Sequence, residues 1–288
     1  MASTAKAGFD QFLGRLTPTQ AARDKASTHR AEIETKLDAK LGVFQMFESG
    51  SFRHGTGVSG KSDVDYFVSL KGVQPTNSVT TLVAVRDALK QRFPSTYIHV
   101  SRPGVVLEFG GGYEKVEIIP AYYKTTSNGN NTYEIPGVLT EWLDSNPKSH
   151  NEYVDDCNKA PAKGDAKGLA RLVKAWKYYR DVPISSFYLE MQAAKYTTGE
   201  TSIDFALDMY YFLNRLKIGG LAAMNDPTGN TGRINPCSSD ANKTAALSRL
   251  DTAVGRAERA KDHYLAGRID KAFAEWDLLF NGQFPAYY

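Results

Sequence analysis

The chain has 288 residues, with 35 Lys and Arg side chains against 32 Asp and Glu, so its net charge is only +3. This length is enough for two lobes that bury a sizeable core, and so small a net charge does not by itself predict nucleic-acid binding. No run of about eighteen apolar residues occurs, and the N-terminus lacks the apolar stretch of a signal peptide. We therefore expect a cytoplasmic protein with no membrane contact.

Cysteine usage excludes two further classes of protein. Only Cys157 and Cys237 are present. Two cysteines provide neither the disulfide framework of a small secreted domain nor a four-cysteine zinc site. Each is expected to be a buried thiol without a role in function.

The first half of the chain is predicted to form a mixed sheet preceded by a helix. Thr17 and Pro18 are typical of a helix start, and the helix is expected to reach about residue 40 and to brace both lobes. A second helix is expected over residues 79–93. The β-branched and aromatic runs between 43 and 123 predict strands near 43–48, 64–70, 98–100, 105–109 and 115–119.

A glycine-serine turn followed by two aspartates is the most specific pattern in this half. Gly50 and Ser51 offer backbone N–H groups and a hydroxyl to a phosphate group. Asp63 and Asp65 then lie one residue apart on the predicted 64–70 strand, where side chains at alternate positions share a face. Two carboxylates so close repel each other unless divalent cations neutralise them, so the pair predicts a magnesium site.

Two-metal phosphoryl transfer normally needs a third carboxylate, for which Glu117 is the candidate. Its apolar β-branched neighbours place it inside a sheet, where a carboxylate without a partner is costly. Glu108 and Glu114 are the structural alternatives, on a separate strand and at a turn. Asp-x-Asp and Gly-Ser each also occur in ordinary loops, so only their combination is specific.

The second half of the chain has the periodicity of helices. Leu169, Leu172, Val173 and Trp176 follow helical spacing. Further helices are expected after Ser185 or Ser186 and over residues 202–217, 241–265 and 269–280. Residues 125–132 are expected to form an exposed turn at the lobe boundary, which divides the chain into a core at 1–130 and a helical lobe at 131–288.

Three residues of the helical lobe suit a nucleoside triphosphate. Lys174 offers a mobile charge, and Ser186 offers a hydroxyl at a helix N-terminus. Phe187 offers a face on which a base can stack. Each also has an ordinary explanation, as a solvated lysine, an N-cap and a core aromatic residue.

The run from Gly50-Ser51 to Asp63-x-Asp65, followed by Val-Glu117-Ile-Ile-Pro, resembles the core of polymerase-β-type nucleotidyltransferases. The run from Leu169 to Trp176, followed by Ser185 to Glu190, resembles the second lobe of the cGAS/DncV-like nucleotidyltransferases (CD-NTases) of bacterial antiphage systems. The resemblance extends from about residue 43 to the closing 276–285 run. The sequence departs from the family pattern at Glu117, because members of the family commonly have aspartate at that position.

This resemblance implies an α+β fold of two lobes with the active site in the cleft between them. It implies a metal-dependent enzyme in which Asp63, Asp65 and Glu117 bind two Mg²⁺ or Mn²⁺ ions. Gly50, Ser51, Lys174 and Ser186 would grip donor phosphates, and Phe187 would lie on the nucleobase. The product would be a cyclic di- or oligonucleotide made from ATP or GTP, with release of pyrophosphate.

The same resemblance sets expectations about partners. A downstream effector is expected to bind the product rather than the enzyme. The zinc-bearing insertion with which animal cGAS engages DNA has no counterpart here, so a nucleic-acid activator is not expected. The alternative function is a template-independent enzyme that adds nucleotides to RNA or tRNA ends, because its metal site and phosphate turn would be the same.

Overall fold

The computed structural model describes residues 2–112, 114–127, 129–138, 140–159, 165–229 and 232–288. The chain divides into two compact units. The sheet unit comprises Pro18–Glu152 and Thr228–Gly232, and the helical unit comprises Met1–Thr17, Tyr153–Pro227 and Arg233–Tyr288.

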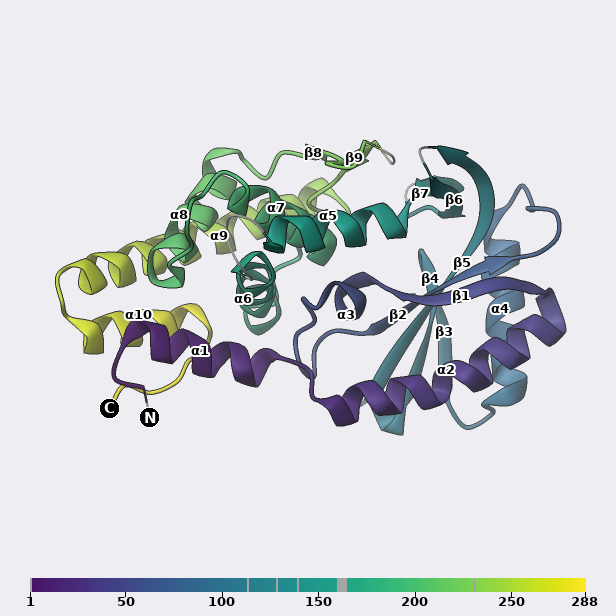
Figure 1. The fold of residues 1–288 in the computed structure, drawn as a ribbon, viewed down its shortest axis with the longest axis horizontal. Coiled ribbons are helices and arrows are strands. Elements are labelled where there is room, and N and C mark those ends of the chain that lie inside the picture. The colour runs from purple at the N-terminus through teal and green to yellow at the C-terminus, as the bar shows by residue number, and fades with distance from the viewer. Residues whose placement is uncertain (1, 113, 128, 139, 160–164, 230–231) are drawn as a thin grey trace. The chain divides into compact units, whose positions relative to one another are not determined.

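The sheet unit contains a seven-stranded mixed sheet within the described ranges (Figure 1). The strands are β1 (Val43–Ser49), β2 (Val64–Leu70), β3 (Tyr97–Ser101), β4 (Gly104–Phe109), β5 (Glu114–Ser127), β6 (Asn130–Pro136) and β7 (Trp142–Ser145). The main path of the sheet runs β1-β2-β5-β4-β3, while β6 pairs with β5 and β7 pairs with β6. Among these described strands, β2 and β5 pair in parallel and every other pair is antiparallel.

One face of this sheet is covered by two helices, α2 (Gln20–Leu41) and α4 (Ser78–Arg92) (Figure 1). Alternate residues of β2 and β5 point into this core, among them Tyr66, Val68 and Ile118. Ile33 and Leu82 from the helices are fully buried against them. Burial of this apolar area fixes the register of β2, because a shift by one residue would reverse both faces.

The opposite face carries the remaining residues of β2 and β5. A smaller apolar cluster lies there, consisting of Phe67, Ala121, Tyr133 and Ile135 with Phe47 and Ile119 packed against it. Asp65 lies two residues before Phe67, and Glu117 lies two residues before Ile119. Residues two apart in a strand share a face, so both acids belong to this second face.

The strand that bears Glu117 is longer than the sequence predicts. The sequence predicts a strand over 115–119, but β5 continues past Pro120 to Ser127. It pairs with β4 up to Ile118 and with β6 from Tyr122 onward. Pro120 lies between these two antiparallel ladders and takes part in neither.

The predicted boundary after residue 130 falls within the hairpin of β5 and β6. Both strands, and β7 after them, are bonded into the sheet, so the first compact unit extends to Glu152. Asn128, in the predicted 125–132 turn, lies outside the described residues. Because β5 and β6 pair across this hairpin, the sheet unit ends closer to the C-terminus than the predicted boundary at residue 130.

The helical unit confirms the predicted periodicity. Leu169, Leu172, Val173 and Trp176 are all buried on one helix. The helices predicted after residue 185 and near 202–217, 241–265 and 269–280 are each present. The helices of the second half are α5 (Pro147–Lys159), whose first turns belong to the sheet unit, α6 (Asp165–Tyr179), α7 (Ser186–Thr197), α8 (Phe205–Ile218), α9 (Asp240–Leu265) and α10 (Ile269–Leu279).

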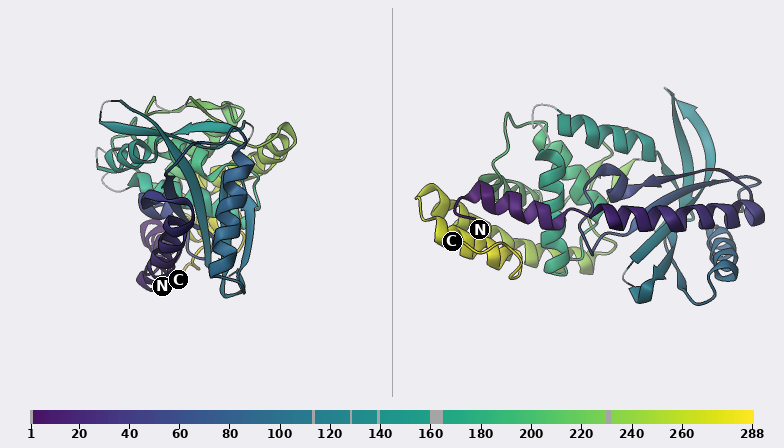
Figure 2. Two further views of the ribbon diagram at one scale, coloured as in Figure 1. Left: turned by 90° about the vertical axis from the view of Figure 1, so that its right-hand side faces the viewer. Right: turned by 60° about the horizontal axis from the view of Figure 1, so that its bottom comes forward.

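Two helices precede the sheet where the sequence predicts one. The predicted 17–40 helix is α2, which begins at Gln20, two residues after Pro18. The additional helix α1 (Ala5–Leu16) packs in the helical unit, where Phe9 meets Trp276 at 4.9 Å between ring centroids. Ala2 forms a bridge with Tyr287, so the chain termini lie side by side (Figure 2).

The two remaining strands, β8 (Met224–Asn225) and β9 (Arg233–Ile234), form a short antiparallel pair. Among the helices that the structure describes, none has the length and apolar character needed to cross a bilayer.

Candidate functional site

The Gly50-Ser51 pair begins a short helix, α3 (Gly50–His54), rather than a plain turn. Gly50 has a φ of +61°, a conformation that glycine adopts without strain. A Cβ atom at Gly50 would lie 1.9 Å from Oδ2 of Asp65. The backbone at the predicted phosphate-binding residue is therefore in direct contact with a predicted metal ligand.

Asp65 and Glu117 come from neighbouring strands and are register partners. The parallel ladder of β2 and β5 pairs Asp65 with Glu117 directly. Partners in a ladder present their side chains on the same face, and these two share a side-chain hydrogen bond. Asp63 lies one residue before β2, and its charge acts on Glu117. The structure therefore brings Asp65 and Glu117 into contact, with Asp63 near enough for its charge to act on Glu117.

The competing glutamates have other partners. Glu108 Oε1 lies 3.4 Å from Lys115 Nζ, and Glu114 Oε2 lies 3.9 Å from His29 Nε2. A Cβ atom at Gly104 of β4 would lie 2.6 Å from Oε1 of Glu117. Glycine at 104 thus leaves the space that the Glu117 carboxyl group occupies, and β4 supports its position.

Glu117 has a strongly perturbed acidity. Burial and, to a lesser extent, the negative charge of Asp63 raise the pKa of Glu117 to about 7, and the hydrogen bond with Asp65 opposes both effects. Adjacent carboxylates repel one another, and a proton on Glu117 relieves that repulsion. Glu117 therefore gains and loses its proton near neutral pH in the absence of a cation.

The donor chemistry fits a hard divalent cation, because all three groups offer carboxylate oxygens. Among the residues that the structure describes, however, no three His, Cys, Asp or Glu side chains have the arrangement of a metal site. Asp65 and Glu117 are instead joined by a side-chain hydrogen bond, in which the carboxyl group of Glu117 accepts. Cation binding would require this bond to open and both carboxyl groups to be deprotonated.

The pKa of Glu117 predicts a pH-dependent stability. The group titrates near 4.5 when unfolded and at about 7 when folded, so the folded chain binds more protons between these values. The free energy of unfolding should therefore fall as pH rises from about 4.5 to about 7. Glu117→Gln should remove this contribution, and urea titrations in chelator across the pH range measure it. Parallel curves for the two proteins would contradict the assignment.

In the helical unit, the structure assigns the two serines that precede α7 to different tasks. Ser185 is the N-cap, and its hydroxyl accepts from the backbone N–H of Tyr188. The hydroxyl of Ser186 accepts from Lys177 Nζ at 2.6 Å and lies 3.2 Å from the hydroxyl of Tyr178. Because Ser185 caps the helix, capping does not account for Ser186.

Lys174 differs from the mobile, solvated lysine that the sequence argument assumes. Its side chain is 1% exposed, and Nζ lies 3.3 Å from Oε2 of Glu190. The lysine that contacts Ser186 is Lys177, whose Nζ donates a hydrogen bond to the serine hydroxyl. Phe187 is 37% exposed on α7, as a residue available for stacking must be.

The buried Lys174–Glu190 pair predicts a stability effect that is separate from catalysis. Glu190→Gln removes the carboxylate charge that lies 3.3 Å from the buried Lys174 ammonium and should lower the free energy of unfolding by about 1–3 kcal/mol. Denaturant titration measures this. A matched Glu258→Gln change on α9 should have an effect within about 0.5 kcal/mol. Equal stabilities for the two variants would show that the pair contributes nothing.

Sequence reasoning missed three contributors to these sites. Lys177 stands three residues after Lys174, and this helical spacing was the only available signal. Glu190 ends the Ser185 to Glu190 run, but only packing shows that it neutralises Lys174. Gly104 carries no sequence signal, because its contact with Glu117 follows from the pairing of β4 with β5.

Comparison with known proteins identifies the family of this chain. The Second Messenger Oligonucleotide or Dinucleotide Synthetase (SMODS) domain matches residues 1–158. A probable cyclic nucleotide synthase of Bacillus cereus strain VD146 is 24% identical over 217 residues, which cover 73% of this chain and 64% of the relative. A cyclic AMP-AMP-AMP synthase of an Acinetobacter species is 26% identical over 98% of this chain and 86% of the relative.

Solved structures agree with the fold. CdnC of Escherichia coli MS115-1 with ATP has a TM-score of 0.74 and 17% identity, covering 97% of this chain and 98% of that one. CdnG of Bradyrhizobium diazoefficiens with GTP, described as a CD-NTase, has a TM-score of 0.73 and 12% identity over 98% of both chains. Vibrio cholerae DncV with its linear intermediate has a TM-score of 0.64 and 14% identity, over 84% of this chain and 69% of DncV. The chain therefore belongs to the SMODS domain family and shares the fold of CdnC, CdnG and DncV.

Proposed function

We propose that the protein joins nucleoside triphosphates into a cyclic di- or oligonucleotide and releases pyrophosphate. The names of its relatives support cyclic nucleotide synthesis. Structures of its neighbours with ATP, GTP and a linear intermediate support triphosphate substrates and stepwise joining. The observation that carries the proposal is the register pair of Asp65 and Glu117 on parallel strands, with Asp63 acting on the same carboxyl group.

Asp63, Asp65 and Glu117 would hold the divalent ions, Mg²⁺ or Mn²⁺. When bound, two such ions supply activation of the attacking hydroxyl and neutralisation of the leaving pyrophosphate. Glu117 contributes a carboxyl group whose pKa of about 7 lets it lose its proton under physiological conditions. Protonation of Glu117 competes with metal binding, so activity should rise with pH through this range.

The Gly50-Ser51 segment binds the donor triphosphate through backbone N–H groups and the serine hydroxyl in this proposal. The contact between Gly50 and Asp65 would hold the donor beside the carboxylates. The acceptor hydroxyl attacks the α-phosphate in line, an O–P bond forms, and the bond to pyrophosphate breaks. A second transfer within the linear product closes the ring.

The helical unit would contribute further contacts to the donor. Ser186 remains the proposed phosphate ligand, and Lys177 beside it supplies the cation that suits a phosphate. Lys174 remains a predicted ligand and would have to exchange Glu190 for phosphate. Phe187 is the proposed stacking surface for the donor base.

The product would serve as a second messenger in bacterial antiphage defence, read by a separate effector. We propose ATP and GTP as substrates. A downstream protein that binds the product rather than the enzyme would complete the pathway.

Incubation with labelled NTPs and Mg²⁺, with and without RNA, tests the proposed reaction. Pyrophosphate release together with small, phosphatase-resistant products is the expected result. Labelled RNA would instead establish terminal nucleotide addition, because that reaction needs the same acids and phosphate turn. Absence of pyrophosphate release from every NTP would contradict the proposal.

A further inference from the structure

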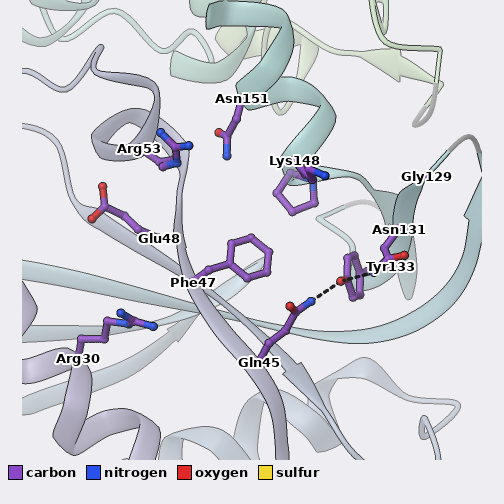
Figure 3. A pocket seen from close by; sticks show the side chains of 11 residues that line it. Arg30, Gln45, Phe47, Glu48, Arg53, Gly129, Asn131, Tyr133, Lys148 and Asn151 are labelled. Atoms are coloured by element: carbon purple, nitrogen blue, oxygen red, sulfur yellow. Dashed lines mark hydrogen bonds between the residues drawn. The ribbon is translucent and has the colours of Figure 1, made fainter.

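A pocket of about 580 Å³ lies in the sheet unit, on a different set of residues from the three acids (Figure 3). Strands β1 and β6 and the first turns of α5 contribute to it. All of its lining residues fall between positions 30 and 151, within one compact unit. The lining that bears on function consists of Gln45, Phe47, Arg53, Tyr133, Lys148 and Asn151.

The pocket combines a flat aromatic surface with polar edges. Phe47 stacks on Phe67 with ring centroids 5.2 Å apart, which fixes its orientation. The Tyr133 hydroxyl accepts hydrogen bonds from Gln45 Nε2 and, at 3.2 Å, from Asn131 Nδ2 (Figure 3). Arg53 and Lys148 add positive charge at the border. A planar heterocycle with polar edges and a phosphate group matches this lining.

Asn151 presents an unsatisfied carbonyl oxygen in the pocket. The residue is 8% exposed, and its buried Oδ1 has no hydrogen-bond partner. Figure 3 shows the side chain extending from α5 toward the space beside Phe47. A buried amide oxygen left without a partner is costly, and rotation of the carboxamide can offer either its donor or its acceptor to a ligand.

The aromatic floor belongs to the same sheet face as the acids. Ser49 pairs with Asp65, and Phe47 pairs with Phe67 one step along the ladder. Phe47 is therefore the diagonal neighbour of Asp65, a separation of about 7–8 Å in an antiparallel pair. A nucleoside with its base on Phe47 would extend its sugar toward the carboxylates.

We propose that this pocket receives the base of the acceptor nucleotide, with Phe47 as the stacking surface and Asn151 as the group that reads the polar edge of the base. This inference rests on the proposed function and extends it to the choice of acceptor. Amide groups distinguish bases by pairing with their donors and acceptors, whereas stacking is tolerant of sequence. Asn151 would thus set specificity, and Phe47 would set affinity.

Binding of nucleoside 5′-monophosphates tests the pocket without requiring turnover. Equilibrium dialysis of AMP, GMP, CMP and UMP in metal-free buffer should show that one base binds most tightly. Phe47→Leu should weaken that binding at least about 5-fold, the lower end of the range for base stacking. Asn151→Ala should also weaken it by about 5-fold, because a hydrogen bond to the base is lost. Asn151→Ala should also reduce the difference between bases, which Phe47→Leu should preserve.

Two controls separate this effect from misfolding and from loss of the metal site. Phe44→Leu makes the same change three residues earlier in β1, at a side chain that is 71% exposed and outside the pocket, and should leave binding unchanged. Asp63→Asn with Asp65→Asn should abolish turnover yet retain monophosphate binding. Thermal unfolding of each variant verifies the fold, and Phe47→Tyr, which keeps an aromatic ring, should retain monophosphate affinity.

The outcomes distinguish this inference from the proposed function. Unchanged monophosphate affinity and base preference in the folded Asn151→Ala variant would overturn the inference, even if wild-type protein makes cyclic product. Unchanged affinity in the folded Phe47→Leu variant would overturn it as well. Absence of monophosphate binding to wild-type protein would also overturn it. Absence of pyrophosphate release from wild-type protein, with base-selective binding retained, would instead overturn the proposed function alone.

Discussion

Replacing Asp63 and Asp65 together by asparagine is expected to lower turnover at least about 100-fold, which corresponds to roughly 2.7 kcal/mol of activation free energy. Asparagine preserves the shape of both side chains but removes the negative charges that would hold divalent cations. It also removes the charge that raises the pKa of Glu117. Mg²⁺-dependent pyrophosphate release measures turnover, and Mn²⁺ titration followed by EPR measures the expected loss of metal affinity.

A matched control removes two aspartate charges elsewhere. Asp87 and Asp156 have side chains that are 53% and 73% exposed, and both lie on helices. Asp87→Asn with Asp156→Asn should retain turnover within about 2-fold, because exposed ion pairs contribute little. Turnover near the wild-type value in the Asp63 and Asp65 double variant would disprove the assignment of these residues as metal ligands.

Gly50→Ala is expected to lower turnover by at least about 100-fold as well, by a different route. The added methyl group would lie 1.9 Å from Oδ2 of Asp65, so either the Asp65 carboxylate or the start of α3 must move. Displacements on the scale of 1 Å in a reacting site can cost about 100-fold in rate. Pyrophosphate release and Mn²⁺ affinity should both fall, because the phosphate segment and the carboxylate are in contact.

Gly60→Ala separates this contact from backbone strain. Gly60 also has a positive φ, +68°, but a Cβ atom there meets nothing within 4 Å. Alanine at either position bears the cost of a left-handed conformation, about 1–2 kcal/mol. Only Gly50→Ala should abolish metal binding. Equal losses of activity in both variants would attribute the effect to strain and not to Asp65.

Local periodicity accounts for the elements that the sequence predicted well. The strand at Val64–Leu70 alternates between the two faces of the sheet, and the apolar residues of α6 recur at helical spacing. Such patterns can be recognised within a short stretch of sequence, because burial of one face of a helix or strand requires apolar residues at the period of that element. The extension of β5 and the strands β6 and β7 lack such a pattern, since their pairing depends on partners distant in sequence.

The acids show the same division between local and distant information. Asp63 and Asp65 are separated by one residue, so their proximity is predictable from sequence. The pairing of Glu117 with Asp65 depends on the parallel register of β2 with β5. Its competitors Glu108 and Glu114 were discounted from sequence by their positions, and the structure supplies their actual partners.

Lys174 illustrates where the argument from sequence failed. A lysine on a helix is normally solvated, but Lys174 is buried against Glu190 because α7 packs beside α6 and brings a counter-ion to it. Which of two serines capped α7 was equally open from sequence. Helical spacing gives the direction of a side chain and not the element that covers it.

The sequence alone determined the order of most helices and strands, the Asp-x-Asp pair and the resemblance to a nucleotidyltransferase, because these depend on residues close together in the chain. Tertiary structure decided the contact of Gly50 with Asp65, the pairing of Asp65 with Glu117 and the pocket beside Phe47. Each of these depends on strand register and packing between distant segments, for which hydrogen bonding and the burial of apolar surface select one arrangement among many.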